Sequence, residues 1–447
     1  MTPPVLEQRV LSTLNADGTR RWLTPRLARG RFLKARRIVG YALIALFVVL
    51  PFVRVGGRPA LLFDLVTREA SVCGLVFRPS DGFLMMLLGL AIVLAVFLVT
   101  ALFGRVWCGW ACPQTVYLEH VFRPLERWLD RRRALPGKRL IQWALYAAIA
   151  AVLANVFLAY FVGVDRLALW VLGSPLDHPV GFAIVVGVAA LVLFDFAYFR
   201  EQTCIVACPY GRLQSVLLDK QSVIVGYDVR RGEPRSQPRR KLQTAGDCVA
   251  CSACVAVCPT GIDIRDGLQM ECIGCAQCID ACDAVMDRVK KPRGLIGYTS
   301  QDVLAGKAKR LLRGRTVIYP VLLALVAGGL ALGVALRDSA EVWVERTNGP
   351  SFVELPGGKI AAQASIKIEN EGDGERRYTF ALADAPDATL RTDPTFRVAP
   401  RKAMSAPLVI ELPRTGFTAG KRTIYVRIAD DAGFHRVVRV QLLGPAS

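Results

Sequence analysis

Two runs of cysteines carry the strongest chemical signal in this 447-residue chain. Each run has the spacing C-x2-C-x2-C-x3-C, which bacterial ferredoxins use to hold two 4Fe-4S clusters. Because the fourth cysteine of each run ligates the other cluster, the spacing predicts two ligand sets. The first set is Cys248, Cys251, Cys254 and Cys282, and the second is Cys272, Cys275, Cys278 and Cys258. Zinc is the alternative, but a tetrahedral zinc site needs only four ligands and leaves the repeated spacing unexplained.

One position departs from the ferredoxin pattern. Asp283 follows Cys282, where the bacterial run has a proline, as in Cys258-Pro259. The reduction potential of a cluster responds to nearby charge and to solvent exposure. Our hypothesis is that the Asp283 carboxylate lowers the potential of the adjacent cluster.

Four further cysteines form two pairs, each of which ends in a proline and follows an apolar segment with an arginine at its end. They are Cys108-x3-Cys112-Pro113 and Cys204-x3-Cys208-Pro209. On a continuous helix this spacing puts both sulfurs of a pair on one face, with Cβ atoms about 5 to 6 Å apart. The duplication indicates parallel repeats whose four thiols converge at the membrane edge. Soft thiolates suit copper or an additional redox centre. The alternatives are ordinary packing and a redox-active dithiol.

Single residues near these pairs are weaker candidates. His120 is either a metal ligand, a proton acceptor for a quinol or, as we expect, an exposed interfacial residue. Asp195 lies in an apolar segment, where a carboxylate is costly and therefore suggests function, although it is near enough to the end to snorkel. We expect Trp107 and Trp110 to anchor at the membrane interface and Cys73 to be an ordinary packing residue.

The segments that must position these cysteines are apolar enough for a membrane protein. The chain is 53% hydrophobic with a mean hydropathy of +0.36. A helix needs ~20 apolar residues to cross the hydrocarbon. We therefore predict an α-helical membrane bundle of five transmembrane helices. The predicted spans are 38–53, 82–104, 140–164, 179–199 and 316–336, of which the first is short enough that Arg37 and Arg54 must snorkel.

The charge distribution predicts the orientation of these helices. Lys and Arg number 57 against 37 Asp and Glu, for a net charge of +20. Most of the excess lies in residues 1–37, 105–139 and 200–315, and basic segments stay on the cytoplasmic side. We predict a bacterial inner-membrane protein with a cytoplasmic N-terminus. Topology thus accounts for the charge without a nucleic-acid partner.

The C-terminal segment has the pattern of a β-sheet protein. Apolar and polar residues alternate in 365–369, 423–428 and 438–442, and turn residues occupy 370–374. We expect a small antiparallel β-sandwich of about 100 residues outside the cytoplasm. The predicted order is therefore a basic cytoplasmic N-terminus (1–37), a four-helix membrane region with both cysteine pairs (38–239), an α+β di-cluster ferredoxin module (240–300), a fifth helix (316–336) and a periplasmic β-domain (337–447).

This order of parts resembles the cytochrome c oxidase accessory proteins known as CcoG, FixG or RdxA. The resemblance covers nearly the full length, including Pro25–Arg31, Gly57–Asp64, both cysteine pairs, the ferredoxin runs and Lys291–Tyr298. It implies a role in assembling cbb-type cytochrome oxidase, in which cluster electrons reduce Cu(II) to Cu(I). It also implies that the C-terminal β-sandwich is immunoglobulin-like. The oxidase or its copper-delivery factors are the partners that the resemblance implies, alongside membrane lipid.

Two other functions fit the same residues. Membrane polyferredoxins that exchange electrons with quinol also combine C-x3-C-P pairs with ferredoxin runs, so a quinol-linked relay is the first alternative. A copper carrier or assembly scaffold with purely structural clusters is the second. The sequence contains neither a G-x-G-x-x-G nor a Walker loop, so electrons must come from an unidentified partner or a quinol.

Overall fold

The computed structural model describes residues 12–15, 17, 19–132, 136–236, 246–308, 312–345, 350–372, 374–400 and 402–445. Parts of the predicted N-terminal segment 1–37 and the first residues of the predicted ferredoxin module, 240–245, lie outside these ranges. The chain divides into two compact units, Met1–Ala331 and Leu332–Ser447, which are described separately.

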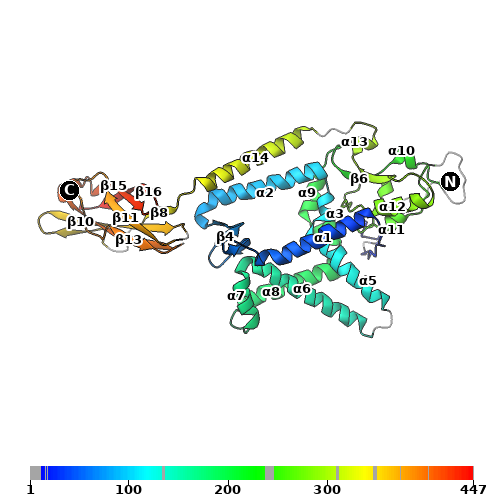
Figure 1. Cartoon of the computed structure of the whole chain (residues 1–447), viewed down its shortest axis with the longest axis horizontal. Coiled ribbons are helices and arrows are strands. Elements are labelled where there is room, and N and C mark those ends of the chain that lie inside the picture. The colour runs from blue at the N-terminus through cyan, green and yellow to red at the C-terminus, as the bar shows by residue number, and fades with distance from the viewer. Residues whose placement is uncertain are drawn as a thin grey trace. The chain divides into compact units, whose positions relative to one another are not determined.

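Within the described residues, five helices are long and apolar enough to cross a membrane. They are α1 (Arg31–Val49, extended by η1, Leu50–Phe52), α2 (Gly82–Phe103), α6 (Lys138–Val162), α8 (Pro179–Phe194, extended by η4, Asp195–Phe199) and α14 (Gly314–Ala335). Helix α14 lies alongside α2 (Figure 1), and the rings of Tyr319 and Phe97 are 6.1 Å apart. The five predicted apolar spans therefore correspond to five helices.

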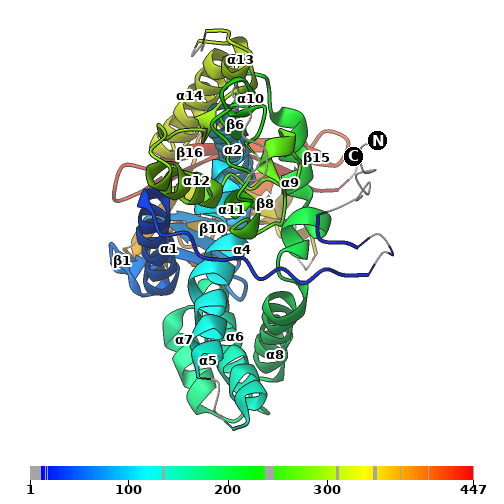
Figure 2. The same ribbon diagram turned by 90° about the vertical axis from the view of Figure 1, so that its right-hand side faces the viewer.

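The first helix begins at Arg31, well before the predicted Ile38. Its free backbone N–H groups find an acceptor in Asp280, whose carboxylate accepts hydrogen bonds from Phe32 N (3.2 Å) and Leu33 N (2.8 Å). Asp280 belongs to α12 (Gln277–Arg288), and Figure 2 shows α1 and α12 side by side. A distant residue thus caps this helix, which is why local sequence signals missed its start.

Short elements connect the membrane helices. After α1 come β1 (Arg54–Val55), β2 (Arg58–Pro59), β3 (Leu61–Asp64), β4 (Glu69–Val72), β5 (Leu75–Phe77) and η2 (Pro79–Asp81), and α7 (Val164–Leu172) follows α6. Cys73 stands with Gly74 in the turn between β4 and β5, where it is exposed and has a φ of 51°. The expectation that it packs in the interior was wrong, because the tight turn points it to solvent.

The segments that carry the two cysteine pairs follow α2 and η4. The first contains α3 (Val106–Trp110), α4 (Pro113–Tyr117), η3 (Leu118–Phe122) and α5 (Arg123–Arg131). The second contains η5 (Thr203–Ala207) and α9 (Pro209–Leu217). The preceding helices end with nearly the same backbone angles, at Gly104 (φ 56°, ψ −128°) and Arg200 (φ 54°, ψ −121°). Each of these residues lies four positions before the first cysteine of its pair. The repeat is therefore visible in the backbone as well as in the sequence.

The ferredoxin module is built around a small antiparallel sheet. Strand β6 (Ile224–Tyr227) pairs with β7 (Ile296–Thr299), and α10 (Val229–Gly232), α11 (Ala253–Ala256), η6 (Ile264–Asp266), α12 and α13 (Gln301–Leu304) complete the fold. Buried Val225, Ile279, Met286 and Ile296 pack around the cysteines. This core holds both cysteine runs in one module.

The C-terminal unit consists of two antiparallel sheets, in agreement with the predicted sandwich. One has the order β12-β14-β10-β8 with β9 also paired to β10, and the other has the order β13-β11-β15-β16. The strands are β8 (Ala340–Glu345), β9 (Phe352–Leu355), β10 (Lys359–Asn370), β11 (Arg376–Leu382), β12 (Thr389–Leu390), β13 (Thr395–Val398), β14 (Ala403–Pro413), β15 (Lys421–Asp430) and β16 (His435–Leu443), with η7 (Arg414–Gly416) after β14. The three period-two segments lie in β10, β15 and β16. Asp373 of the predicted turn lies outside the described residues.

The cap on α1 predicts a measurable loss of stability. Asp280→Ala should lower the free energy of unfolding by about 1 to 2 kcal/mol, because two N–H groups lose their acceptor. Thermal unfolding of the purified protein measures this loss as a lower Tm. Asp280→Asn should lose less stability, since its single amide oxygen still accepts from one of the two N–H groups, which donate to different carboxylate oxygens. An unchanged Tm for Asp280→Ala at full iron content would show that the cap contributes nothing.

Candidate metal centres

The predicted second ligand set lines a single cavity. Cys258, Cys272, Cys275 and Cys278 surround it together with Cys254 and apolar side chains. Burial raises the pKa of Cys272 to about 11 and that of Cys275 to about 12. Buried thiols of this kind lose their protons only when a cation replaces them, as iron ions do in a cluster.

The predicted first ligand set differs in its exposure. Cys248, Cys254 and Cys282 are buried, whereas Cys251 is exposed. Burial, with further contributions from Cys254 and Asp283, raises the pKa of Cys282 to about 12. The charges of Cys248 and Cys251 also raise the pKa of Cys282. The four sulfurs therefore lie in one neighbourhood, with one of them at the surface.

Both runs share an unusual backbone conformation beside their second cysteine. Ala250 and Ser252 have φ angles of 51° and 52°, and Gly274 and Ala276 have φ angles of 67° and 60°. Left-handed backbone costs a non-glycine residue roughly 1 to 2 kcal/mol. Loops that alternate in this way can aim their N–H groups at an anion. The conformation fits a negatively charged iron–sulfur cluster enclosed by the loop.

The two membrane-edge pairs do not lie on continuous helices, so the expectation that each pair occupies one helical face was wrong. Cys112 (φ −61°, ψ 127°) and Cys208 (φ −72°, ψ 110°) have extended backbone and precede the prolines that begin α4 and α9. A proline ring disfavours helical conformation in the residue before it. Pro113 and Pro209 therefore break each segment at its second cysteine.

The four membrane-edge thiols nevertheless converge. Burial, together with the charges of Cys112 and Cys108, raises the pKa of Cys204 to about 12. Cys208 likewise raises the pKa of Cys108, whose largest shift comes from burial. Such mutual effects require short separations. Among the described residues, no three His, Cys, Asp or Glu side chains form a compact group around a single metal-ion position.

The first thiol pair is packed against the second ferredoxin run. A Cβ atom on Gly109 would lie 2.6 Å from the carbonyl oxygen of Ile273 and 2.7 Å from Cys275 N. No side chain fits there without a shift of the backbone. Arg105 donates to the carbonyl oxygens of Met270 and Cys272 (3.5 Å), and a bond from Trp110 Nε1 to Tyr298 Oη (2.8 Å) closes the contact.

Trp110 thus contacts the ferredoxin module through its polar atom, and the expectation of a simple membrane anchor was wrong for this residue. Tyr298 continues the chain of hydrogen bonds by donating to the carbonyl oxygen of Gly274 (2.6 Å). Trp107 is 44% exposed, which is compatible with a position at the membrane interface.

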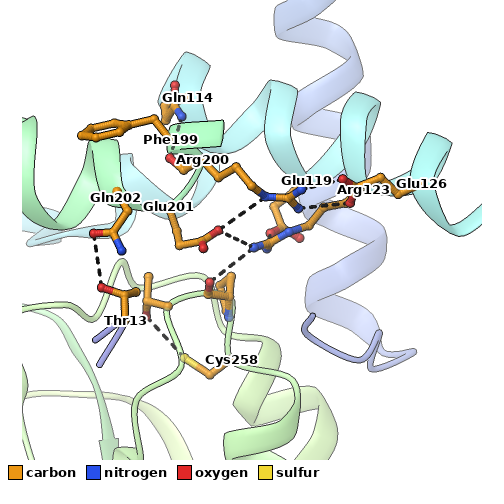
Figure 3. Close-up of polar contacts among 12 residues, drawn as sticks. Thr13, Gln114, Glu119, Arg123, Glu126, Phe199, Arg200, Glu201, Gln202 and Cys258 are labelled. Carbon is orange, nitrogen blue, oxygen red and sulfur yellow. Dashed lines mark hydrogen bonds and ion pairs between the residues drawn. The ribbon is translucent and has the colours of Figure 1, made fainter. Parts of the chain in front are cut away.

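A buried network of charges joins the two repeats to the module (Figure 3). Arg123 donates to Glu119, to Glu201 (3.2 Å) and to the carbonyl oxygen of Pro259 (3.5 Å), which directly follows Cys258. Arg200 forms a bidentate pair with Glu126, at 2.5 and 3.0 Å. Glu119 lies one helical turn from Arg123, but Glu201 is 78 residues from Arg123 and Arg200 is 74 residues from Glu126, so no local pattern predicts these two ion pairs.

His120 and Asp195 have structural partners. His120 is buried against Gly40, so the expected exposed position was wrong, and burial with the charge of Arg36 lowers its pKa to about 4. Asp195 accepts hydrogen bonds from Gln114 Nε2 (3.2 Å) and from the Thr203 hydroxyl. Because these two donors belong to different repeats, the carboxylate ties the two cysteine segments together.

Three domain families match the chain. A 4Fe-4S binding domain covers residues 85–136, a 4Fe-4S dicluster domain covers 199–301, and the Ig-like fold at the C-terminus of FixG covers 330–445. The first match includes Cys108 and Cys112, and the second includes Cys204 and Cys208 as well as both ferredoxin runs. Together with the five apolar helices, these matches show that the chain is a multi-pass membrane iron–sulfur protein that transfers electrons.

Curated relatives resolve the family. Protein RdxA of Cereibacter sphaeroides is 35% identical, over 80% of this chain and 81% of its own length. Nitrogen fixation protein FixG of Rhizobium meliloti is 32% identical, over 93% and 91%. The chain belongs to the FixG/RdxA family. The crystal structure of a FixG-related protein from Vibrio parahaemolyticus matches 24% of this chain and 98% of its own, at 16% identity and a TM-score of 0.22.

The position of Asp283 explains why the second ferredoxin run lacks a proline there. It also defines a test of the hypothesis that this carboxylate lowers the potential of the adjacent cluster. Asp283 lies inside α12, where proline would remove a helical hydrogen bond, and its carboxylate accepts from Gly294 N (3.0 Å). We predict that Asp283→Asn raises one midpoint potential by tens of millivolts, roughly the effect of removing one nearby charge. Redox titration followed by EPR measures the shift. Asp287→Asn on the exposed face of α12 is the control, and equal potentials in both variants would refute the charge effect.

Proposed function

We propose that this protein is a membrane-bound reductase that passes single electrons from a di-cluster ferredoxin module to copper(II) at the four membrane-edge thiols. The observation that carries the proposal is the contact of Gly109 with Cys275. It joins the backbone of the first thiol pair to the loop that holds the second ligand set. Electrons leaving that set would therefore have a short route to the thiols, through this backbone contact and the hydrogen bond from Arg105 to the Cys272 carbonyl oxygen (3.5 Å).

The difference in exposure gives this route a direction. We assign the first cluster to Cys248, Cys251, Cys254 and Cys282, and the second to Cys272, Cys275, Cys278 and Cys258. When bound, the two clusters supply one-electron transfer. Exposed Cys251 puts the first ligand set within reach of a soluble donor, whereas Cys275 is buried beneath the thiol pair. Electrons would thus arrive at the first set and leave from the second.

The chemistry of the thiols suits copper as the substrate. Cys108, Cys112, Cys204 and Cys208 are soft ligands, and soft thiolates favour Cu(I). Burial raises the pKa of Cys108 and of Cys204 to about 12, so each keeps its proton until a metal ion displaces it. Reduction consumes one electron for each Cu(II) that becomes Cu(I). Arg105 links the two regions, because it donates to the carbonyl oxygens of Cys272 (3.5 Å) and of Gly211 in α9 (2.5 Å).

The cellular setting follows from charge and family. We propose a bacterial inner-membrane protein whose segments 1–37, 105–139 and 200–315 face the cytoplasm and whose domain 337–447 is periplasmic. The basic residues of those three segments support this orientation. Relatives in the family motivate the proposal that cbb-type cytochrome oxidase, or its copper-delivery factors, receives the Cu(I). The electron donor is a separate protein or a quinol.

Copper reduction is tested with anaerobically purified protein whose clusters have been reduced. Adding Cu(II) should reoxidise the clusters, measured by EPR, and form one Cu(I) per electron, measured with a cuprous chelator. Replacing Cys108, Cys112, Cys204 and Cys208 together by serine should abolish Cu(I) formation while iron stays at about eight atoms per chain. Cys73→Ser is the matched control, because that thiol is exposed in a distant turn.

Other outcomes identify the alternatives. Clusters that stay reduced with Cu(II) but are oxidised by a quinone would assign a quinol-linked relay. Clusters that cannot be reversibly reduced and oxidised would indicate a copper carrier or an assembly scaffold with purely structural clusters. Wild-type iron well above about eight atoms, lost with the four serines, would place a third cluster on these thiols.

The backbone contact has its own test. Gly109→Ala should slow reduction of Cu(II) several-fold, since a Cβ atom there pushes the second ferredoxin run away from the thiols and electron transfer slows steeply with distance. Stopped-flow reoxidation of the reduced clusters measures the rate, and iron content should remain unchanged. Gly297→Ala is the matched control, because a Cβ atom there meets nothing within 4 Å. Equal rates in both variants would exclude the Gly109 contact from the route.

A further inference from the structure

A cavity rich in arginine lies where α1 and α5 meet the extended segment before α1. Its volume is about 340 Å³, and Arg29, Arg37, Arg127, Arg131 and Trp128 contribute to its wall. These residues come from three separate stretches of chain that the fold brings together. The cavity lies apart from the cysteine sites, and none of its wall residues belongs to either ligand set.

The cavity lacks negative charge. No carboxylate lines it, and in the part of the chain that the structure describes none of its four guanidinium groups has an ion-pair partner. Burial, together with the charges of Arg123 and Arg37, lowers the pKa of Arg127, while Glu119 opposes this effect. Four cations held around one space with no carboxylate in its wall favour the binding of an anion.

The side chains suit a phosphate group in particular. A guanidinium group presents its N–H donors in a planar fork that matches two phosphate oxygens. Trp128 is 46% exposed beside them, and tryptophan is enriched at the level of lipid headgroups. Basic pockets between membrane helices on the cytoplasmic side commonly bind anionic lipid headgroups.

The exposed apolar residues of α1 favour a phospholipid over a soluble phosphate as the ligand of this cavity. Arg37 directly precedes the apolar part of this helix, and Tyr41 lies one turn further on the same face. Ile38 is 71% exposed and Tyr41 is 52% exposed. The surface next to the cavity is therefore apolar and open, as the acyl chains of a lipid require. We propose that this pocket binds the phosphate of an anionic phospholipid whose chains lie along α1.

Native mass spectrometry of the delipidated full-length protein, titrated with phosphatidylglycerol or phosphatidylcholine, tests the proposal. Phosphatidylglycerol should bind more tightly, and Arg127→Gln combined with Arg131→Gln should weaken it about 30-fold, as expected for the loss of two cationic contacts. Arg288→Gln with Lys290→Gln removes the same charge from the exposed end of α12 and the turn after it, and should leave the affinity unchanged.

Three results would overturn the proposal. One is equal affinity for the two lipids, and another is equal weakening by the pocket and control variants. The third is inorganic phosphate that binds the pocket as tightly as phosphatidylglycerol does, which would assign it to a soluble anion. If the first variant loses iron, Arg29→Gln with Arg37→Gln addresses the same cavity from the other side. Unaltered lipid binding in that folded variant would also refute the site.

Discussion

The close packing of Gly109 on the loop of Cys275 is the constraint on which the rest of the membrane-proximal structure depends. A backbone-to-backbone contact with no room for a Cβ atom fixes distance and orientation more tightly than a contact between side chains. Arg36, which is almost fully buried, secures it by donating from Nε to the Gly109 carbonyl oxygen (2.9 Å). The soluble cofactor module and the membrane thiols consequently behave as one body around this point.

Buried arginines connect the cysteine segments to the ferredoxin module. Arg36, Arg105 and Arg123 each donate to backbone carbonyl oxygens of another segment. A guanidinium group can satisfy several carbonyl groups at once while its charge is balanced nearby, as Glu119 and Glu201 do for Arg123. Removing one partner of such a buried pair typically costs 3 to 5 kcal/mol, about half of the stability of a small domain. The joint is thus specific and sensitive to single substitutions.

The sequence predicted what depends on local pattern. Apolar length revealed the five helices, and alternation revealed β10, β15 and β16, because both signals arise within one element. The start of α1 was missed because its cap, Asp280, comes from a helix far along the chain. The helical pairing of Cys108 with Cys112 failed for a local reason that was visible, since Pro113 restricts the residue before it. Ion pairs such as Arg200 with Glu126 had no local signal at all.

One equivalent position in the two repeats, Gly104 and Arg200, shows how the two copies differ in their packing. Gly104 and Arg200 share nearly the same backbone angles, but a Cβ atom at Gly104 would lie 2.2 Å from the Val223 carbonyl oxygen. The first repeat therefore needs glycine, because the chain leading into β6 of the ferredoxin module passes directly over it. The second repeat has space for a side chain and uses Arg200 to hold Glu126, although this backbone conformation is strained for a non-glycine residue. Gly104 and Gly109 of the first repeat thus pack against the backbone of the ferredoxin module, whereas Arg200 of the second repeat pairs with Glu126 of the first-repeat segment. The two copies therefore share a backbone shape but have different structural roles, because one is joined to the module and the other to its own duplicate.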